Sequence, residues 1–271
     1  MTPLALAVRD SSTLLRRNLL HVRRYPSLTL NLLLTPLVLL LLFVYVFGDV
    51  MSTGIAVGDT GVGSAEATGR SAYLAYLTPG ILLMTLGTTL VGTAVSVAND
   101  MTEGIINRFR TMAIHRGAVL IGRVAGSVLQ AVASVVLVGV VAVAIGFRSV
   151  DATALEWVAA FGLLVLIAVA LTWIAMAVGM ISPNGEAAGN NAVPLVVLPF
   201  ISSAFVPVDQ MPGWFRPLAE YQPFTPAVET LRGLLLGTEI GPNAWLTVVW
   251  CLALALVGYV WSTSLFHRDP A

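Results

Sequence analysis

NDMTEGIINRFRTMAIHR, at residues 99–116, is a polar segment between two long apolar stretches of the sequence. Only 10% of the residues are charged, yet this segment contains Asp100, Glu103, Arg108, Arg110, His115 and Arg116. Its apolar residues recur at steps of three and four, which predicts an amphipathic helix. The acidic side chains come first and the cationic ones last, the order that a helix dipole favours. We therefore predict a helix outside the lipid that docks onto a folded partner.

The apolar stretches around this segment identify an all-α integral membrane protein. Mean hydropathy is +0.88, and several apolar runs exceed the roughly 20 residues with which a helix crosses a bilayer. The sequence predicts a single transmembrane domain over residues 1–271, in which Pro194 and Pro199 break the fifth of six membrane-spanning helices. The predicted spans are 28–47, 73–98, 119–147, 157–181, 190–205 and 245–266.

Residues 1–25 have the pattern of an interfacial helix rather than a cleavable signal peptide. Five arginines occur among them, and the apolar run that follows is too long for a signal peptide. The arginines lie opposite one apolar helical face, which suits a helix lying on anionic lipid. A solvated basic tail is the alternative, but it leaves the apolar face unexplained. That face consists of Leu4, Val8, Leu15, Leu19 and Val22.

Residues 206–243 differ from the other loops because they combine prolines with aromatic side chains. This segment is too polar to span the bilayer and too apolar to extend into solvent, so we predict an external, half-inserted re-entrant hairpin between spans five and six. Pro226 opens a helical stretch in which one face is formed by Ala227, Leu231, Leu234 and Leu235. Rings with the amphipathic character suited to the lipid headgroups are Trp214, Phe215, Tyr221 and Phe224.

Arginine is distributed unevenly between the two sides that the six spans define. Ten of the fourteen arginines fall on one side, with five before residue 28, four within 108–123, and Arg268. The other side has Arg70, Arg148, Arg216 and Arg232. Because cytoplasmic loops carry the excess of positive charge, we predict that both termini and residues 99–116 are cytoplasmic.

Composition excludes several kinds of site. The chain has no lysine, which a P-loop needs on the nucleotide phosphates, so it cannot hydrolyse ATP by a Walker A site of its own. The single cysteine, Cys251, lies in an apolar run, and His21, His115 and His267 are far apart in the sequence. We therefore expect no catalytic residue, bound cofactor or metal ion in this chain. A net charge of zero gives no indication of nucleic acid as a partner.

The predicted spans also lack acidic residues and lysine in their central parts. Proton- and sodium-coupled carriers usually keep ionisable groups there, so a secondary transporter is disfavoured. A pathway between these helices would be lined by Thr, Ser, Asn and aromatic side chains. Such a lining suits an amphipathic or lipid-like compound.

Three segments resemble the permease subunits of type-2 ATP-binding-cassette exporters, specifically the daunorubicin-resistance branch. They are YLTPGI at 76–81, NDMTEGIINRFRTMAIHR at 99–116 followed by Gly122-Arg123, and FVPVDQMPGWFRPLAEYQPFTPAVETLRG at 205–233. The resemblance covers most of the chain, and the three segments have the order and spacing of the family. It implies a bacterial plasma-membrane protein that exports a drug-like or lipid-like compound. The export would be powered by a separate ATPase subunit that binds ATP and magnesium.

In that family, the cytoplasmic segment between spans two and three is a coupling helix that docks into a cleft of the ATPase. Two permease chains, identical or related, line the path, and the N-terminal amphipathic helix also contacts the ATPase. Family members often have proline at the position of Ala113, so the helix here is expected to extend towards His115. By position, the implied docking residues are Asp100, Glu103, Gly104, Arg108, Phe109, Arg110 and Arg116.

Two questions have alternative answers at this point. The four rings of the 206–243 hairpin either anchor it in the outer leaflet or form an external gate that contacts the departing compound, as the resemblance suggests. The chain as a whole is either a transport subunit or a non-transporting scaffold or anchor within a larger assembly. A transport subunit stimulates and couples a partner ATPase, whereas a scaffold does not.

Overall fold

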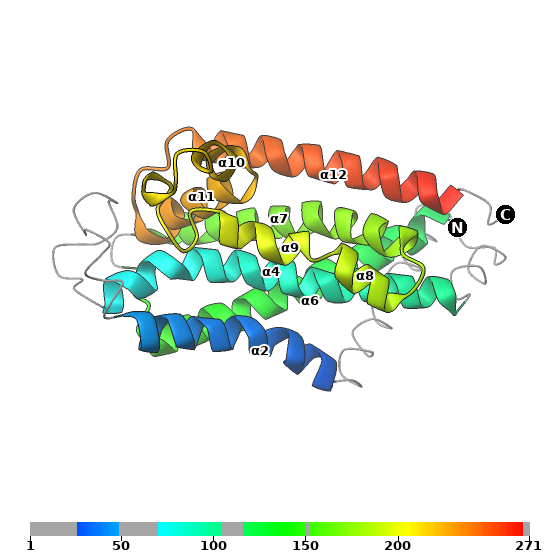
Figure 1. Ribbon diagram of the computed structural model, residues 1–271, viewed down its shortest axis with the longest axis horizontal. Helices are drawn as coiled ribbons and strands as arrows, with labels where there is room; N and C mark the ends of the chain where they lie inside the picture. Colours follow the sequence, from blue (N-terminus) through cyan, green and yellow to red (C-terminus); the bar gives the residue numbers. More distant parts are fainter. Residues whose placement is uncertain (1–25, 49–69, 104–115, 150–151, 268–271) are drawn as a thin grey trace.

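The computed structural model describes residues 26–48, 70–103, 116–149 and 152–267. Within these ranges every regular element is a helix (Figure 1). In chain order the elements are α2 (Pro26–Leu42), the π-helical η1 (Phe43–Phe47), α4 (Arg70–Thr102), α6 (Arg116–Ile145), α7 (Ala154–Ile181), α8 (Gly185–Asn191), α9 (Pro194–Val197), the 3-10 helices η2 (Leu198–Ile201) and η3 (Val208–Gln210), α10 (Arg216–Tyr221), α11 (Phe224–Leu236) and α12 (Asn243–His267).

Four of the described helices, α4, α6, α7 and α12, are long and apolar enough to cross a membrane. A shorter apolar stretch, Leu34–Val46, covers the second half of α2 and most of η1. The prediction of an all-helical protein with apolar spans is therefore confirmed for the described residues. The helix ends differ from the predicted spans by a few residues, because caps and turn residues rather than hydropathy set them.

The turn between α6 and α7 illustrates how such ends are set. α6 stops at Ile145 because Gly146 adopts a φ of 121°, a conformation that side chains with a Cβ rarely adopt. α7 begins earlier than predicted because Thr153 and Glu156 form a capping box. The Thr153 side chain accepts a hydrogen bond from the Glu156 amide, and the Glu156 carboxylate accepts one from the Thr153 amide at 2.6 Å. These bonds satisfy amide groups that lack partners at a helix start.

α4 is the central helix of the molecule (Figure 1). It packs against α2, α6, α7 and the α8–α9 segment, whereas α12 packs mainly on α7. Of the most apolar stretch of α4, 78% is buried, against 17% for α12. Other helices of the chain therefore surround α4, whereas most of the apolar surface of α12 is not covered by the rest of the chain.

Two glycines allow α4 to approach its neighbours closely. A Cβ at Gly80 would lie 2.5 Å from the Ala204 Cβ, and a Cβ at Gly87 would collide with the carbonyl oxygen of Leu195. Gly87 follows Gly80 by two helical turns, so both glycines lie on the same side of α4. Small residues at such positions let membrane helices pack backbone against backbone. α4 is thereby in direct contact with the segment that precedes the 206–243 hairpin.

The predicted fifth span at 190–205 is not one continuous helix. α8, α9 and η2 follow one another along α4, as Figure 1 shows. Pro194 lies in the first turn of α9, and Pro199 lies in the first turn of η2. Because proline lacks an amide hydrogen, it starts a new turn and interrupts the hydrogen-bond ladder before it. The predicted breaks at these two prolines are confirmed.

Residues 206–243, the segment predicted to be a hairpin and called the 206–243 hairpin below, contain η3, α10 and α11 and lie at one end of the molecule, beside the start of α12 (Figure 1). Its main helix, α11, begins at Phe224 rather than at Pro226 and ends at Leu236, where Gly237 caps it with a φ of 71°. The face predicted for this helix is buried, as expected, and consists of Ala227, Leu231, Leu234 and Leu235.

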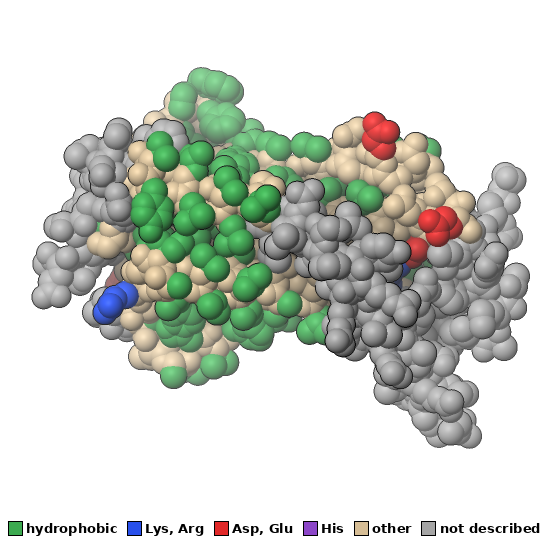
Figure 2. All heavy atoms as spheres, turned by 90° about the horizontal axis from the view of Figure 1, so that it is seen from below, with side chains coloured by type: hydrophobic (Ala, Val, Ile, Leu, Met, Phe, Trp, Pro, Cys, Tyr) green, Lys and Arg blue, Asp and Glu red, His purple; other side chains and the backbone are tan. Residues whose placement is uncertain are grey.

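Hydrophobic side chains cover the middle of the face shown in Figure 2, and the described charged side chains on it lie towards the two ends of the long axis. This distribution is the one that a hydrocarbon layer around the middle of the protein requires, because charged groups are costly there. The distribution of side chains on this face and the lengths of the helices therefore both fit a protein that crosses a membrane.

Some predicted features fall outside the described residues, namely the interfacial helix at 1–25 and residues 104–115 of the polar segment. The described start of that segment differs from expectation. α4 continues through Thr102, so residues 99–102 extend the second span instead of opening a separate helix. The backbone has no helix-breaking residue at this point, and the Glu103 amide donates to the Asn99 carbonyl oxygen at 2.9 Å.

Candidate functional site

A largely buried ion pair joins the end of α4 to the start of α6, the two helix ends that flank residues 104–115. The Arg123 guanidinium of α6 pairs with the Asp100 carboxylate of α4 and donates to the Ser96 hydroxyl at 2.6 Å. Each side chain of the pair is 19% exposed. Because a guanidinium can donate in two directions at once, it fixes both helices to one geometry. The ends of α4 and α6 are thus held together where the chain leaves the apolar layer.

The residues predicted to dock a partner are not all equivalent in the structure. Asp100 is engaged with Arg123, whereas Glu103, at the end of α4, is exposed and available to a partner. Arg116 is the first residue of α6. The remaining four, Gly104, Arg108, Phe109 and Arg110, lie outside the described residues.

The ion pair leads to a stability prediction. Reversing either charge alone, by Asp100→Arg or Arg123→Asp, places like charges together and should lower the free energy of unfolding by about 1–2 kcal/mol. Reversing both should restore most of that loss. The measurement is denaturant unfolding of the detergent-purified protein, followed by circular dichroism. If the double variant lost as much unfolding free energy as the two single variants together, the two side chains would not interact.

A second polar cluster lies at the other end of α4 and connects it to the hairpin. The guanidinium of Arg232, on α11, lies over the Tyr76 ring with its Cζ 3.9 Å from the ring centroid. Its Nη2 donates to the carbonyl oxygens of Ser203 at 3.0 Å and of Tyr76 at 3.3 Å. The Tyr76 hydroxyl donates to the same Ser203 oxygen at 2.8 Å. Three segments distant in the sequence therefore meet at one side chain.

The charge of Arg232 is balanced within α11. Its Nη1 donates to the Glu229 carboxylate at 2.7 Å, one helical turn earlier. The Arg232 side chain is only 5% exposed, whereas that of Glu229 is 33% exposed. A buried cation without partners would be strongly destabilising. The Glu229 carboxylate, the two carbonyl oxygens and the Tyr76 ring together stabilise the Arg232 charge in the interior.

Neither Tyr76 nor Arg232 was among the residues predicted from sequence to be functional. A signal for Arg232 was present, because it follows Val228 by four residues and precedes Leu235 by three, and both of these are buried. A charged residue in register with the apolar face of a helix indicates a buried partner. For Tyr76 the only signal is its place in the segment YLTPGI, which carries no charge.

The four hairpin rings do not form one surface. Trp214 and Tyr221 are 82% and 68% exposed, and Phe215 is half-buried against Trp214 with the ring centroids 5.3 Å apart. Phe224, in contrast, is 3% exposed and lies in the core. The expectation of a ring at the headgroups is therefore wrong for Phe224, because it occupies the first turn of α11 on the side that packs inward.

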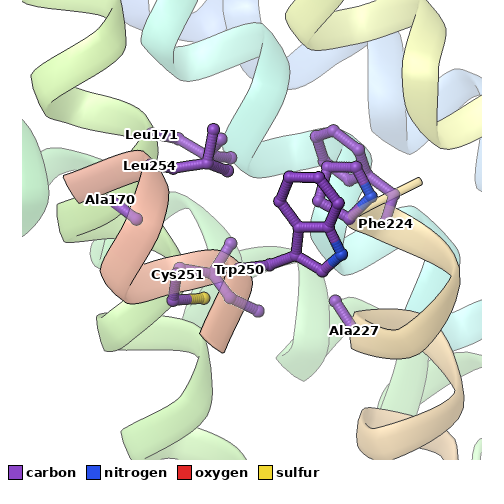
Figure 3. Close-up of a pocket in the computed structure, with 9 residues that line it drawn as sticks. Ala170, Leu171, Phe224, Ala227, Trp250, Cys251 and Leu254 are labelled. Atoms are coloured by element: carbon purple, nitrogen blue, oxygen red, sulfur yellow. The ribbon is translucent and has the colours of Figure 1, made fainter. Parts of the chain in front are cut away.

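Phe224 lines a small apolar pocket between α7, α11 and α12. Figure 3 shows Phe224 beside Trp250, with Leu171, Cys251 and Leu254 around the same space. The lining offers no charged group, so this pocket has no means of holding an ion. Its walls show instead how α11 is packed into the rest of the fold, with the hairpin helix closing the space between α7 and α12.

Comparison with known proteins identifies the relatives of this chain. Residues 10–236 match the ABC-2 type transporter family. The daunorubicin resistance ABC transporter permease protein DrrB1 of Streptomyces coeruleorubidus is 29% identical over 255 residues, which cover 93% of this chain and 83% of that protein. Nodulation protein J of Rhizobium meliloti is 27% identical over 236 residues, covering 83% of this chain and 82% of that protein.

A third relative, the probable doxorubicin resistance ABC transporter permease protein DrrC of Mycobacterium tuberculosis, is 21% identical over 180 residues, covering 65% of this chain and 64% of that protein. The family match includes both polar clusters of α4 and the hairpin helix α11, since it runs from residue 10 to residue 236. On this match and on the apolar helical fold, the chain belongs to the ABC-2 type transporter family.

Proposed function

We propose that the chain is the transmembrane permease subunit of an ATP-driven exporter in a bacterial plasma membrane. It would pair with a second permease chain and with a separate ATPase that binds ATP and magnesium. Its cargo would be an amphipathic drug-like or lipid-like compound; two relatives are named for resistance to the drugs daunorubicin and doxorubicin. The observation that carries the proposal is the family match over residues 10–236.

The described fold supports a six-pass arrangement. α2, α4, α6, α7, the α8–α9–η2 segment and α12 run alternately in opposite directions along the long axis (Figure 1). In this arrangement the end of α4 and the start of α6 face the cytoplasm together with both termini. The 206–243 hairpin then faces outward. The exposed carboxylate of Glu103 supports docking of the ATPase at the cytoplasmic end.

The test is purification of the chain from its native membranes in mild detergent, followed by a search for a bound ATPase with Walker motifs. The complex is then placed in proteoliposomes, and ATP-driven movement of daunorubicin is followed by its fluorescence. We expect the ATPase to remain bound and daunorubicin to move only with ATP and magnesium. A chain that purifies without an ATPase, or that leaves its hydrolysis rate unchanged, would be a scaffold rather than a permease.

The orientation has a separate test that uses two exposed glutamates at opposite ends. In a Cys251→Ser background, Glu239→Cys should react with an impermeant thiol reagent added to intact cells. Glu186→Cys, on α8, should react only after the cells are permeabilised, because the arginine excess places that end in the cytoplasm. Both positions are exposed, so access to the reagent differs only by side of the membrane. Labelling of residue 186 in intact cells would invert the topology.

A further inference from the structure

The Arg232 cluster is neutralised within α11, whereas its other hydrogen bonds leave that helix. Its guanidinium bonds are directed out of the hairpin, to the backbone of Ser203 and of Tyr76 on α4. The carboxylate that neutralises it, Glu229, belongs to α11 itself. If α11 moves away from α4, the ion pair moves with it as a neutral unit, and only bonds to uncharged groups are broken. The contact can therefore open without leaving a buried charge unpaired.

Two polar atoms of the cluster also lack hydrogen bonds in the described structure. The Arg232 Nε and the Ser203 hydroxyl oxygen are both buried without a partner among the described residues. Arg232 and Ser203 are 4% and 1% exposed, so water does not reach these atoms freely. Buried polar groups are normally paired, and an unpaired one makes its conformation less favourable. The packing of α11 against α4 thus combines several hydrogen bonds with two buried polar atoms that have no partner among the described residues.

We propose that Arg232 is the positioning residue that holds the 206–243 hairpin closed on α4, and that outward opening of the path requires its bonds to Ser203 and Tyr76 to break. This rests on the exporter function proposed above. In the closed state the Tyr76 ring and two carbonyl oxygens fix the guanidinium, and with it α11, over the segment between η2 and the hairpin. In the open state these groups meet water, and the Arg232–Glu229 pair remains intact on α11.

The test measures access of water to the cluster in the detergent-purified permease, so it needs no ATPase and no assumption about orientation. The reporter is Ser203→Cys in a Cys251→Ser background, labelled with a water-soluble methanethiosulfonate reagent. Since the Ser203 hydroxyl makes no hydrogen bond to a described residue, a thiol replaces it without breaking a described bond. We expect slow labelling of this chain. Adding Arg232→Gln should raise the labelling rate about tenfold or more, because hydrogen bonds from a charged donor are among the stronger ones.

The matched control is Arg216→Gln. Arg216 also lies in the hairpin and donates to a backbone carbonyl, that of Asp209, but this bond stays within the hairpin. It should leave the labelling rate of the Ser203→Cys reporter unchanged. A second reporter, Ser134→Cys, is buried on α6 and reports general loosening of the fold. Faster labelling at residue 203 alone supports the proposal, and equal increases at residues 203 and 134 overturn it.

Two milder variants keep the proposal testable if Arg232→Gln does not fold. Arg232→Lys keeps the charge but loses the fork by which Nη1 reaches Glu229 while Nη2 reaches the two carbonyl oxygens. Tyr76→Phe keeps the ring but loses the bond to Ser203. Each should raise the labelling rate at residue 203 by a smaller factor than Arg232→Gln. Unchanged labelling in both would overturn the proposal. Failure of the exporter function would be visible separately, as a permease that purifies without an ATPase.

Discussion

Replacing Gly87 by valine should separate α4 from the broken segment α8–α9–η2 and should produce the largest loss of stability of any substitution considered for this chain. A Cβ at Gly87 would overlap the Leu195 carbonyl oxygen and lie 3.0 Å from its carbonyl carbon. Both are backbone atoms and cannot rotate away as the end of a side chain can. Overpacking against such atoms should lower the free energy of unfolding by about 3 kcal/mol or more.

The measurement is unfolding of the purified protein in increasing denaturant, with the yield of membrane-inserted protein as a second readout. Gly162→Ala on α7 is the matched control, since no heavy atom lies within 4 Å of a Cβ there. That change should be neutral or stabilise the helix by up to about 1 kcal/mol, because alanine favours helix more than glycine does. If Gly87→Val unfolded at the same denaturant concentration as the unaltered protein, the close contact between α4 and α9 would be refuted.

Much of the fold could be predicted because membrane-spanning helices are recognisable in the sequence as long apolar runs. Long apolar runs predicted α4, α6, α7 and α12, and the prolines at 194 and 199 predicted the breaks in the fifth span. Helix ends were less accurate, since they depend on local groups such as Gly146 and the Thr153 capping box. The extension of α4 through Thr102 was not predicted, because charge and polarity there were taken as the start of a new helix.

The candidate sites were harder to predict because they depend on contacts between distant segments. Asp100 was expected to face a partner, but its carboxylate pairs with Arg123, which is 23 residues away. Phe224 resembles Trp214 in its aromatic character, yet one is core and the other is surface. Amphipathic character alone does not say which side of a short helix packs inward. Arg232 contacts Tyr76 although the two residues are 156 positions apart in the sequence, and no local pattern encodes a contact over that separation.

The two polar clusters lie at the two ends of the same helix. Asp100 and Tyr76 belong to α4, a helix of 33 residues that is mostly buried. At about 1.5 Å per residue such a helix is long enough to cross the bilayer, and Pro79 removes one bond of its hydrogen-bond ladder close to Tyr76. We expect a displacement of the Asp100 end of α4 to reach the hairpin through the contact of Tyr76 with Arg232. This gives the proposed docking of an ATPase near residues 99–116 a physical route to the opposite end.

The effect on transport should be largest at the residues that we propose to dock the ATPase. We expect Glu103→Ala or Arg108→Ala to abolish ATP-driven efflux while the protein still inserts and folds. Glu103 is exposed at the end of α4, so its loss should change the free energy of unfolding by no more than about 0.5 kcal/mol. Arg108 lies outside the described residues, and its role rests on its place in the polar segment. A contact energy that differs between the two ATPase states is what coupling requires, and removing it should uncouple hydrolysis from transport.

The measurement is daunorubicin efflux from proteoliposomes that contain the permease and its ATPase, with ATP hydrolysis followed in the same sample. Glu220→Ala is the matched control, because Glu220 is also an exposed glutamate but lies on α10, at the hairpin end of the molecule. The control should keep both efflux and hydrolysis, whereas the Glu103 and Arg108 variants should lose efflux and either retain hydrolysis or lose the bound ATPase. Unchanged efflux in both variants would contradict docking of the ATPase at residues 99–116, and the polar segment that interrupts the apolar sequence would then need another explanation.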